Sequence, residues 1–584
     1  MKIFAPDLIL LHAPSVYDFR TEPVMFGPIS DVIPSSAVFE MYPVGFSAIL
    51  EYLEKHGFRV RIINLAFQML DDPLFDPEKL IKKLSPVAFG IDLHWLPHAQ
   101  GSLEVAALCK KYHPQTPVIF GGYSATYFHR ELISYPQVDV VVRGDSTENT
   151  LLQLLGTLKE QKPLQDIAGI TYKEKGLIHC NPSLNPPADL NYCSNNYLSL
   201  FKNSIKFGVR GFTPIYDWWE YPITAVMTCR GCTQNCVICG GSQYALKKFC
   251  NRDTVAYRSP ELIVEDIRKI CRYTRAPIFV VGDLRQPGDS YAETILQGLR
   301  LLNFENRLVL ELFEPAPDLY FKKISSAVRH FNFEISPESH DETIRKASGK
   351  FYTNQALEMS ISAALEHGCE KFDVFFMIGL PRQTYQSVME TIDYCEYLMQ
   401  KYDRRLNPFI SPLAPFIDPG SIAYEESEKV GYRIFCRTLE EHRKALLAPS
   451  WKHTLSYETK WMTRDEIAAS TYEAALRLNR LKKKYGLVSE TIYREVEHRI
   501  KKAQEVLARI DEIMQTVPAA RQREALLALK QDIDLVNEST LCHRDEIKWP
   551  AGKRPFRFFN IVKDLLWGSK AHGLRRRNTG HFFA

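Results

Sequence analysis

Apolar, strand-like runs alternate with helical patterns along the first third of the chain. Helical spacing of apolar residues covers 43–57 and 101–113, and the β-branched runs cover residues 7–13, 59–65, 87–93, 117–122 and 138–144. Strands that alternate with helices favour a parallel sheet covered on both faces, with ligands beyond the carboxyl ends of the strands. The pattern predicts an α/β domain with a doubly wound parallel sheet over residues 1–185.

A second alternating series begins after a predicted hairpin at 169–180 and a proline-containing linker at 186–221. Its six strand-like runs cover residues 223–228, 276–283, 307–313, 330–336, 371–380 and 407–416. Six strand–helix units in about 200 residues are too few for a closed eight-unit barrel. We therefore expect an open, partial (β/α)6 barrel over residues 222–420.

The rest of the chain is predicted to be helical. Residues 489–514 repeat apolar positions every three or four residues, which indicates an amphipathic helix within a helical C-terminal domain at 421–548. The tail at 549–584 mixes basic with aromatic residues, as segments that contact a membrane surface do. The alternative interpretation is a helix docked on the body of the protein, followed by a frayed basic end.

Composition narrows the class of protein. Of the 584 residues, 45% are apolar and 24% charged, and the net charge of +4 gives no strong general attraction to nucleic acid. No run reaches the ~20 apolar residues of a membrane span, and the N-terminus lacks a signal peptide pattern, so we expect a cytoplasmic protein. Its 13 cysteines are then expected to be reduced, and a cluster of them is expected to bind metal.

Four cysteines lie within eleven positions, at 229, 232, 236 and 239. A zinc site would use two Cys-x-x-Cys pairs, but zinc ribbons typically separate the pairs by ~15 to 20 residues, and here three residues separate them. The bacterial ferredoxin pattern requires a cysteine at 235, where the chain has Asn235. The spacing that remains is Cys232-x-x-x-Cys236-x-x-Cys239, with Cys229 outside it.

This spacing resembles the three-cysteine motif of the radical S-adenosylmethionine (SAM) superfamily. The resemblance implies that Cys232, Cys236 and Cys239 hold three irons of a [4Fe-4S] cluster and leave the fourth iron to the amino and carboxylate groups of SAM. The reduced cluster would then give one electron to the sulfonium, which yields methionine and a 5′-deoxyadenosyl radical. Relatives often carry serine at the position of Cys229, so we interpret it as a bystander, and a role next to the cluster is the alternative.

Further positions extend the resemblance to the SAM-binding parts of the family. Near the fourth strand, where relatives contact the ribose and carboxylate of SAM, stand Glu334, Ser336, Glu338 and Arg345. In the family, one segment lets the backbone approach the cofactor closely, a second binds the amino group of SAM, and a third lies along the adenine. These segments correspond here to Gly240 and Gly241, to Gly282 and Asp283, and to Gly379, Leu380 and Pro381. Each of these residues could instead serve only a capped helix start or a loop hydrogen bond.

The N-terminal domain resembles the cobalamin-binding module that is fused to many radical SAM enzymes, a module of flavodoxin-like strand order. Its recurrent Gly-Gly…Asp-x-Val-x-x-Gly-[Glu/Asp]-x-x-Glu pattern matches Gly121, Gly122, Asp139, Gly144, Asp145 and Glu148. A Gly-Gly pair after a strand also makes a tight turn in unrelated sheets.

Modules that place a histidine under the cobalt carry Asp-x-His-x-x-Gly after the first strand, and this chain lacks that motif there. Asp92-Leu93-His94 follows the third strand and lacks the glycine, so we interpret it as a coincidence. We therefore expect cobalamin without a protein histidine below the cobalt, with His12 and His94 as the alternatives.

Residues 1–420 together resemble a cobalamin-binding-domain radical SAM protein. The resemblance implies an enzyme that uses a [4Fe-4S] cluster, SAM and cobalamin to methylate an unactivated carbon of a small-molecule or lipid-like substrate, with a second SAM remethylating the cobalamin. It also implies an external one-electron donor such as flavodoxin or ferredoxin. The alternatives are a cyclase or rearrangement enzyme with the same cofactors, and a binding module in which the cysteines hold a structural metal. No catalytic residue is assigned.

Overall fold

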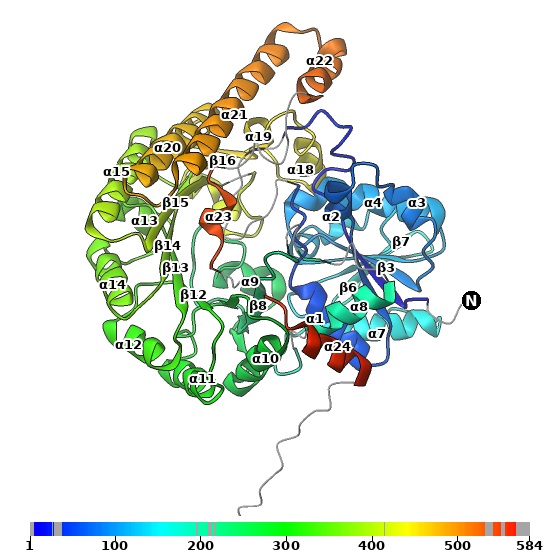
Figure 1. Ribbon diagram of the computed structural model, residues 1–584. Helices are drawn as coiled ribbons and strands as arrows, with labels where there is room; N and C mark the ends of the chain where they lie inside the picture. Colours follow the sequence, from blue (N-terminus) through cyan, green and yellow to red (C-terminus); the bar gives the residue numbers. More distant parts are fainter. Residues whose placement is uncertain are drawn as a thin grey trace, which may run out of the picture.

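The computed structural model describes residues 5–25, 27, 38–193, 197–207, 213–214, 218–413, 415–531, 541–550 and 555–567. Two parallel sheets dominate the described part of the chain and lie side by side, the N-terminal sheet in blue and cyan and the second sheet in green (Figure 1). In the last third, the helix α20 (Arg464–Lys484) packs beside one edge of the second sheet (Figure 1).

The N-terminal strands form a sheet in the order β2-β1-β3-β4-β5-β6-β7. The first five are parallel: β1 (Leu8–His12), β2 (Val60–Asn64), β3 (Ala88–Asp92), β4 (Val118–Gly121) and β5 (Val140–Val142). An antiparallel hairpin adds β6 (Ile170–Glu174) and β7 (Leu177–Cys180). The order 2-1-3-4-5 confirms the predicted flavodoxin-like, doubly wound sheet.

Helices cover both faces of this sheet. One face packs against α1 (Gly45–Lys55), α7 (Glu148–Lys159) and α8 (Tyr197–Phe207). The other packs against α2 (Leu65–Asp71), α3 (Pro77–Ile81), α4 (Ala99–Tyr112), α5 (Tyr123–Tyr127) and α6 (His129–Leu132). Because α8 lies within 186–221, the segment predicted as a linker contains a packed helix.

The second sheet is an open barrel of parallel strands in the order β15-β14-β13-β12-β11-β8. Its strands are β8 (Thr224–Met227), β11 (Ile278–Val281), β12 (Leu308–Leu312), β13 (Phe331–Glu338), β14 (Lys371–Ile378) and β15 (Leu406–Pro412). The outer helices are α10 (Pro260–Tyr273), α11 (Asp289–Leu301), α12 (Asp318–Ala327), α14 (Asn354–Glu366) and α15 (Tyr385–Lys401). This arrangement confirms the predicted partial (β/α)6 barrel.

The C-terminal region is mainly helical, with α20 (Arg464–Lys484), α21 (Glu490–Thr516) and α22 (Ala519–Gln531). It also contains a small antiparallel sheet, β16 (Tyr432–Ile434) with β17 (Tyr457–Thr459), which the sequence did not predict. Strands of three residues are too short to show a period of two, so their pattern could not be recognised.

The helix α24 (Phe558–Trp567) lies against α10, where Asp564 Oδ1 accepts a 2.6 Å hydrogen bond from Arg272. Its free side exposes Phe558, Phe559 and Val562. Docking of this part of the predicted tail agrees with the second interpretation, whereas 551–554 and 568–584 lie outside the described residues. Among the described helices, none is both long and apolar enough to span a bilayer.

Candidate active site

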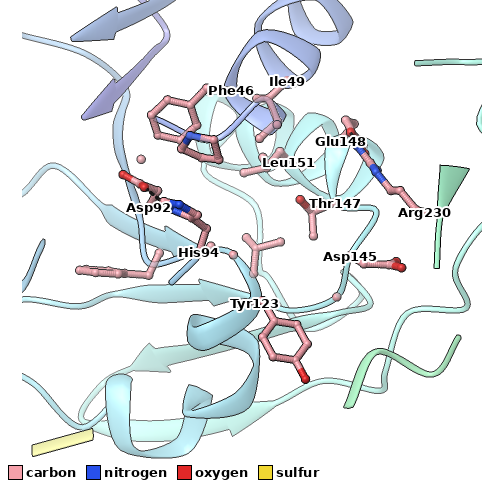
Figure 2. Close-up of a pocket in the computed structure, with 18 of the residues that line it drawn as sticks. Phe46, Ile49, Asp92, His94, Tyr123, Asp145, Thr147, Glu148, Leu151 and Arg230 are labelled. Carbon is pink, nitrogen blue, oxygen red and sulfur yellow. Dashed lines mark hydrogen bonds and ion pairs between the residues drawn. The ribbon is translucent and has the colours of Figure 1, made fainter. Parts of the chain in front are cut away.

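A first cavity, of about 450 Å³, opens at the carboxyl ends of β3, β4 and β5. It runs back between the sheet and the helices α1 and α7 (Figure 2). Its deep part is apolar and is lined by Leu8, Leu10, Phe46, Ile49, Ile119, Val142 and Leu151. At Gly90 a Cβ atom would lie 2.8 Å from Leu10 Cδ2, so a side chain there would displace its neighbour on β1.

The glycines predicted to bind cobalamin lie on this cavity. Gly121, Gly122 and Gly144 all line it. Gly122 has φ 111°, and a Cβ atom on it would lie 2.4 Å from His94 Cα, so only glycine fits there. A Cβ atom on Gly121 would meet nothing within 4 Å. The backbone after β4 therefore leaves room beside it that a bulky flat ligand can occupy.

The polar rim of the first cavity includes Asp92 and His94. Asp92 Oδ2 lies 2.7 Å from His94 Nδ1 and 3.0 Å from the Nδ1 of His12, which is fully buried. Burial alone would raise the pKa of Asp92, but His12 and His94 together hold it well below its usual range. Burial also opposes a charge on His12, yet the neighbouring carboxylate raises the pKa of His12.

The predicted Gly-Asp-x-x-Glu pattern joins the two domains. Glu148 Oε2 accepts a 2.9 Å hydrogen bond from Arg230 of the barrel, and Asp145 Oδ1 accepts one of 3.1 Å from Arg252. Burial would raise the pKa of Glu148, but the Arg230 guanidinium outweighs it and lowers that pKa. Because Arg230 and Glu148 also line the first cavity, both domains build its wall.

A second cavity, of about 440 Å³, lies at the mouth of the barrel. Its wall carries three thiols, several carboxyl groups, one ammonium and an aromatic patch. The polar members are Cys232, Gln234, Cys236, Cys239, Glu311, Glu314, Glu334, Ser336, Glu338, Lys350 and Asp418. The aromatic members are Trp95, which comes from the N-terminal domain, Phe313 and Phe416.

The three predicted cluster cysteines face this second cavity together. Backbone N–H groups donate to two of their sulfurs, from Gln234 to Cys232 and from Gly241 to Cys239, each at 3.3 Å. Hydrogen bonds of this kind stabilise thiolates that bind iron–sulfur clusters. Burial raises the pKa of Cys232 and of Cys236, so the buried thiolates need a positive partner such as iron.

The three thiols on the second cavity do not form a site for a single metal ion in the described structure. Among the described residues, no three His, Cys, Asp or Glu side chains lie close enough to hold a single metal ion. In a [4Fe-4S] cluster each cysteine binds a different iron, so its sulfurs are farther apart than the ligands of one ion. Cys229 lines the first cavity and not the second. The three remaining thiols therefore fit a cluster with one iron left without a protein ligand.

Carboxyl groups opposite the thiols are poised for a ligand. Glu334 Oε2 and Glu338 Oε2 are buried and find no hydrogen-bond partner in the described part of the chain. Glu338 also pairs with Lys350 at 2.7 Å. Burial, followed by the nearby Asp283 charge, raises the pKa of Glu311 to about 7. Buried polar atoms without partners mark a site whose ligand supplies the missing bonds, and the hydroxyl and ammonium groups of SAM would supply them.

Several residues predicted to bind SAM lie elsewhere. Asp283 accepts hydrogen bonds from Arg285 and from the Phe313 N–H, and the described cavity wall does not include it. Arg345 is fully buried and donates to the carbonyls of Ser339 and Tyr352, and the described cavity wall does not include it.

The predicted adenine turn is also held internally. The N–H groups of Gly379 and Leu380 both donate to Gln383 Oε1, and a Cβ atom on Gly379 would lie 2.2 Å from Tyr457 Oη. Neither these residues nor Pro381 line the cavity in the described structure, whereas Met377 on the same strand does.

Glu311 is a cavity residue that the sequence reasoning missed, as it missed Lys350, Asp418 and Trp95. It sits on β12, and its Oε2 accepts a 2.6 Å hydrogen bond from the N–H of Gly282. The predicted Gly282 therefore supports a cavity carboxyl that comes from the next strand. A signal was available, because an acidic residue inside the apolar run Leu308–Leu312 is unusual for a buried strand.

A thin wall separates the two cavities. Gly241 lines the first cavity, while Cys239, whose sulfur its N–H contacts, lines the second. Next to them, Asp418 accepts hydrogen bonds from the Gly240 N–H at 3.0 Å and from Trp95 Nε1 at 3.3 Å. A Cβ atom on Gly240 would lie 2.9 Å from Asp418 Cβ, so glycine keeps this wall thin.

Family models match the two parts of the chain that contain the cavities. Residues 31–153 match the B12 binding domain, and residues 226–395 match the radical SAM superfamily. The chain is thus a radical SAM enzyme with an N-terminal cobalamin-binding domain. Its donor set fits the cofactors of these domains, a [4Fe-4S] cluster with SAM in the second cavity and cobalamin in the first. This result favours an enzyme over the alternative of a non-catalytic binding module.

Individual relatives are distant. The uncharacterized methyltransferase PH0819 of Pyrococcus horikoshii is 25% identical over 373 residues, which are 61% of this chain and 73% of that protein. The cytidylyl-2-hydroxyethylphosphonate methyltransferase of Streptomyces wedmorensis is 23% identical over 269 residues, 38% of this chain. That match spans 48% of the Streptomyces protein, about half its length.

Two solved structures share the fold. The radical SAM methyltransferase TsrM from Kitasatospora setae, solved with tryptophan substrate and a SAM analogue, has a TM-score of 0.55 at 13% identity. The match covers 83% of this chain and 89% of TsrM. The cobalamin-dependent SAM radical enzyme OxsB, solved with aqua-cobalamin, has a TM-score of 0.54 at 14% identity, with 96% of this chain and 80% of OxsB covered.

Proposed function

We propose that this enzyme transfers a methyl group to an unactivated carbon of a small-molecule substrate. The observation that carries the proposal is the pair of cavities on opposite sides of the wall formed by residues 239–241 and Asp418. When bound, the cluster would supply the electron for reductive cleavage of SAM, and cobalamin would supply the methyl carrier. Direct transfer requires both cofactors to reach one substrate position, and this is supported by the shared linings, because Arg230 of the barrel lines the first cavity and Trp95 of the N-terminal domain lines the second.

The cysteine loop would hold the cluster through Cys232, Cys236 and Cys239. Its geometry is fixed by the backbone, because the Val237 N–H donates to the Ser348 carbonyl at 2.9 Å. Gly349, with φ 90°, follows directly, and a Cβ atom on it would lie 2.7 Å from the Asn235 carbonyl oxygen. The loop and the segment after α13 (Glu342–Ala347) therefore pack too closely for any other residue at this position.

Lys350 and the carboxyl groups around it would orient SAM. The Lys350 ammonium is the cation on the described wall of the second cavity and would attract the SAM carboxylate. Glu334 and Glu338, whose free oxygens face no described partner, would accept hydrogen bonds from the ribose hydroxyls or the ammonium of SAM. The aromatic patch would exclude water from the remaining space, where a substrate would bind.

Two relatives whose names state methyl transfer support methylation over ring formation. Both curated relatives are methyltransferases by name, and so is TsrM. A single electron must enter for each cleavage of SAM, so we also propose an external one-electron donor such as flavodoxin or ferredoxin. The cyclase alternative uses the same cofactors. The products formed from SAM distinguish it from methylation.

The test is anaerobic reconstitution of the full chain with iron, sulfide and cobalamin, addition of SAM and a chemical one-electron reductant such as dithionite, and mass spectrometry of what SAM becomes. Methyl transfer predicts both 5′-deoxyadenosine and S-adenosylhomocysteine. Deoxyadenosine alone would support the cyclase, and intact SAM would contradict both. The variant Cys236→Ala is the matched control and is expected to produce no deoxyadenosine.

A further inference from the structure

The rim of the first cavity contains a histidine that the proposed chemistry has not used. His94 follows β3 and lines the cavity beside Asp92 (Figure 2). Its Nδ1 lies 2.7 Å from Asp92 Oδ2. The same carboxylate contacts His12 Nδ1 at 3.0 Å, and His12 Nε2 lies 3.0 Å from the Phe39 carbonyl oxygen. This chain of contacts anchors the ring of His94 from behind.

The contact with Asp92 determines which ring nitrogen of His94 carries the proton. A carboxylate accepts but cannot donate, so Nδ1 must be the N–H of His94. In the neutral ring Nε2 then presents a lone pair, and the hydrogen bond found for His94 among the described residues is the one at Nδ1. Histidines that bind metals in proteins have this arrangement, in which one nitrogen donates to a carboxylate and the other faces the metal.

The exposed fractions of the side chains distinguish His94 from its neighbours. The side chain of His94 is 29% exposed, whereas Asp92 is 3% exposed and His12 is fully buried. Since His94 lines the cavity, its exposed part belongs to the cavity wall. The neighbouring His98 differs, because it is buried and its Nδ1 contacts the Ala13 carbonyl oxygen at 3.0 Å.

We propose that His94 Nε2 is an axial ligand of the cobalt of bound cobalamin, with Asp92 and His12 as positioning residues. This inference rests on cobalamin binding in the first cavity but not on methyl transfer. It reverses the expectation drawn from the sequence, which dismissed Asp92-Leu93-His94 because it follows the third strand. In the sheet β1 and β3 are direct neighbours, so a ligand after β3 emerges beside the end of β1, where His12 lies.

The ligand would matter for reactivity, because an axial imidazole donates electrons to a metal and so tunes its potential. A hydrogen-bonded carboxylate strengthens that donation by making the imidazole more basic. The anchored ring of His94 would thus act on the cofactor through the bond at Nε2 and through its fixed orientation.

The test is electron paramagnetic resonance of the full chain loaded with hydroxocobalamin and reduced only to the Co(II) state. A coordinated nitrogen atom of natural isotopic abundance splits each cobalt hyperfine line of the spectrum into a triplet. The dimethylbenzimidazole of free cobalamin also contains nitrogen, so the protein is prepared a second time with ¹⁵N-labelled histidine. We expect the triplet to become a doublet in the labelled protein only.

Variants add an independent readout. His94→Gln is expected to bind cobalamin with unchanged stoichiometry and to lose the nitrogen splitting. His179→Gln, on β7 of the same domain, should keep it. An unsplit spectrum of the wild type, or a triplet that survives ¹⁵N labelling, would overturn the proposal. If His94→Gln does not fold, the labelled wild type still decides. Failure to bind cobalamin at all would instead contradict the proposed function.

Discussion

The two cavities are almost equal in volume but differ in how they would hold a ligand. The first is lined by apolar side chains and bare glycine backbone, and its charged rim residues Glu148 and Arg230 are already paired with each other. The second carries three thiols and two buried carboxyl oxygens without described partners. The first cavity selects a ligand by shape, and the second by coordination and charge.

This difference follows from where each cavity sits in its sheet. The first extends back between a flat sheet and its covering helices, where only apolar surface is available. The second lies at the carboxyl ends of barrel strands, where loops and strand ends can point polar groups at one centre. Substitutions should therefore affect the two cavities in different ways. In the second cavity they remove groups that bind the ligand, and in the first they fill the space that the ligand needs.

The largest expected effect is on the second cavity. Cys239→Ala removes one cluster ligand, and we expect iron and sulfide content to fall and deoxyadenosine formation to drop below detection, because the remaining two thiols cannot hold the cluster. Cobalamin binding in the first cavity should persist. Cys250→Ala, a buried cysteine on neither cavity, is the matched control. Simultaneous loss of cobalamin would show that the two sites do not behave separately.

The next largest effect is expected on cobalamin affinity when the first cavity is filled by a side chain. Gly121→Leu places a side chain where a Cβ atom meets nothing within 4 Å, so the domain should fold while the cavity is filled. We expect cobalamin affinity to weaken about 10- to 100-fold, the cost of ~1–3 kcal/mol of overpacking. Equilibrium dialysis measures it, and iron content should not change.

The control for this variant is Gly156→Leu on α7, which also has open space around its Cβ position but lies outside the cavity. Equal affinities for the wild type and Gly121→Leu would mean that cobalamin does not occupy this cavity.

A smaller effect, on the stability of the protein, is expected for the ion pair that joins the two domains. Arg230→Met leaves Glu148 buried without its partner, which costs about 3–5 kcal/mol of stability. The pKa of Glu148 is lowered in the folded protein. The pair's contribution is therefore full above the ordinary glutamate pKa of about 4.3 and is lost as the pH falls through the lowered value.

Urea denaturation at several pH values measures this difference. The penalty of Arg230→Met should be largest at high pH and should shrink as the pH falls towards the lowered pKa of Glu148, because burial raises the pKa of the unpaired Glu148 in the variant and its protonation removes the unpaired charge. Arg268→Met, which breaks an exposed pair with Glu265, should cost at most about 1 kcal/mol. A penalty of that size for Arg230→Met would mean that the pair does not join the domains.

The sequence predicted the parts that depend on local pattern. Strand positions, both sheets and the cysteine spacing followed from the order of apolar runs and thiols. The residues that face a cavity could not be predicted in the same way. Asp283 has the right position after its strand, yet the adjacent Arg285 takes up its carboxylate, while Glu311 reaches the cavity from the next strand.

The contacts around Asp92-Leu93-His94 show the same limit of sequence patterns. The place of this segment along the chain was judged by strand number, whereas the neighbours of a strand in the sheet decide which side chains meet. His12 and Asp92 are 80 residues apart and touch only because β1 and β3 pair. Contacts of this kind depend on sheet order, which single-residue patterns do not contain.

The smallest effect on iron content and stability is expected for substitution of Cys229, whose sulfur belongs to the first cavity. Cys229 is close in sequence to the cluster cysteines, yet it lines the first cavity, and its Sγ lies 3.8 Å from the Gly231 carbonyl oxygen. Cys229→Ser is nearly isosteric, so we expect unchanged iron content and a stability change within about 1 kcal/mol. The measurement is iron and sulfide analysis of anaerobically purified protein, with Cys232→Ser as the matched comparison. If Cys229→Ser lost iron as Cys232→Ser does, the fourth iron would have a protein ligand, and SAM could not bind there.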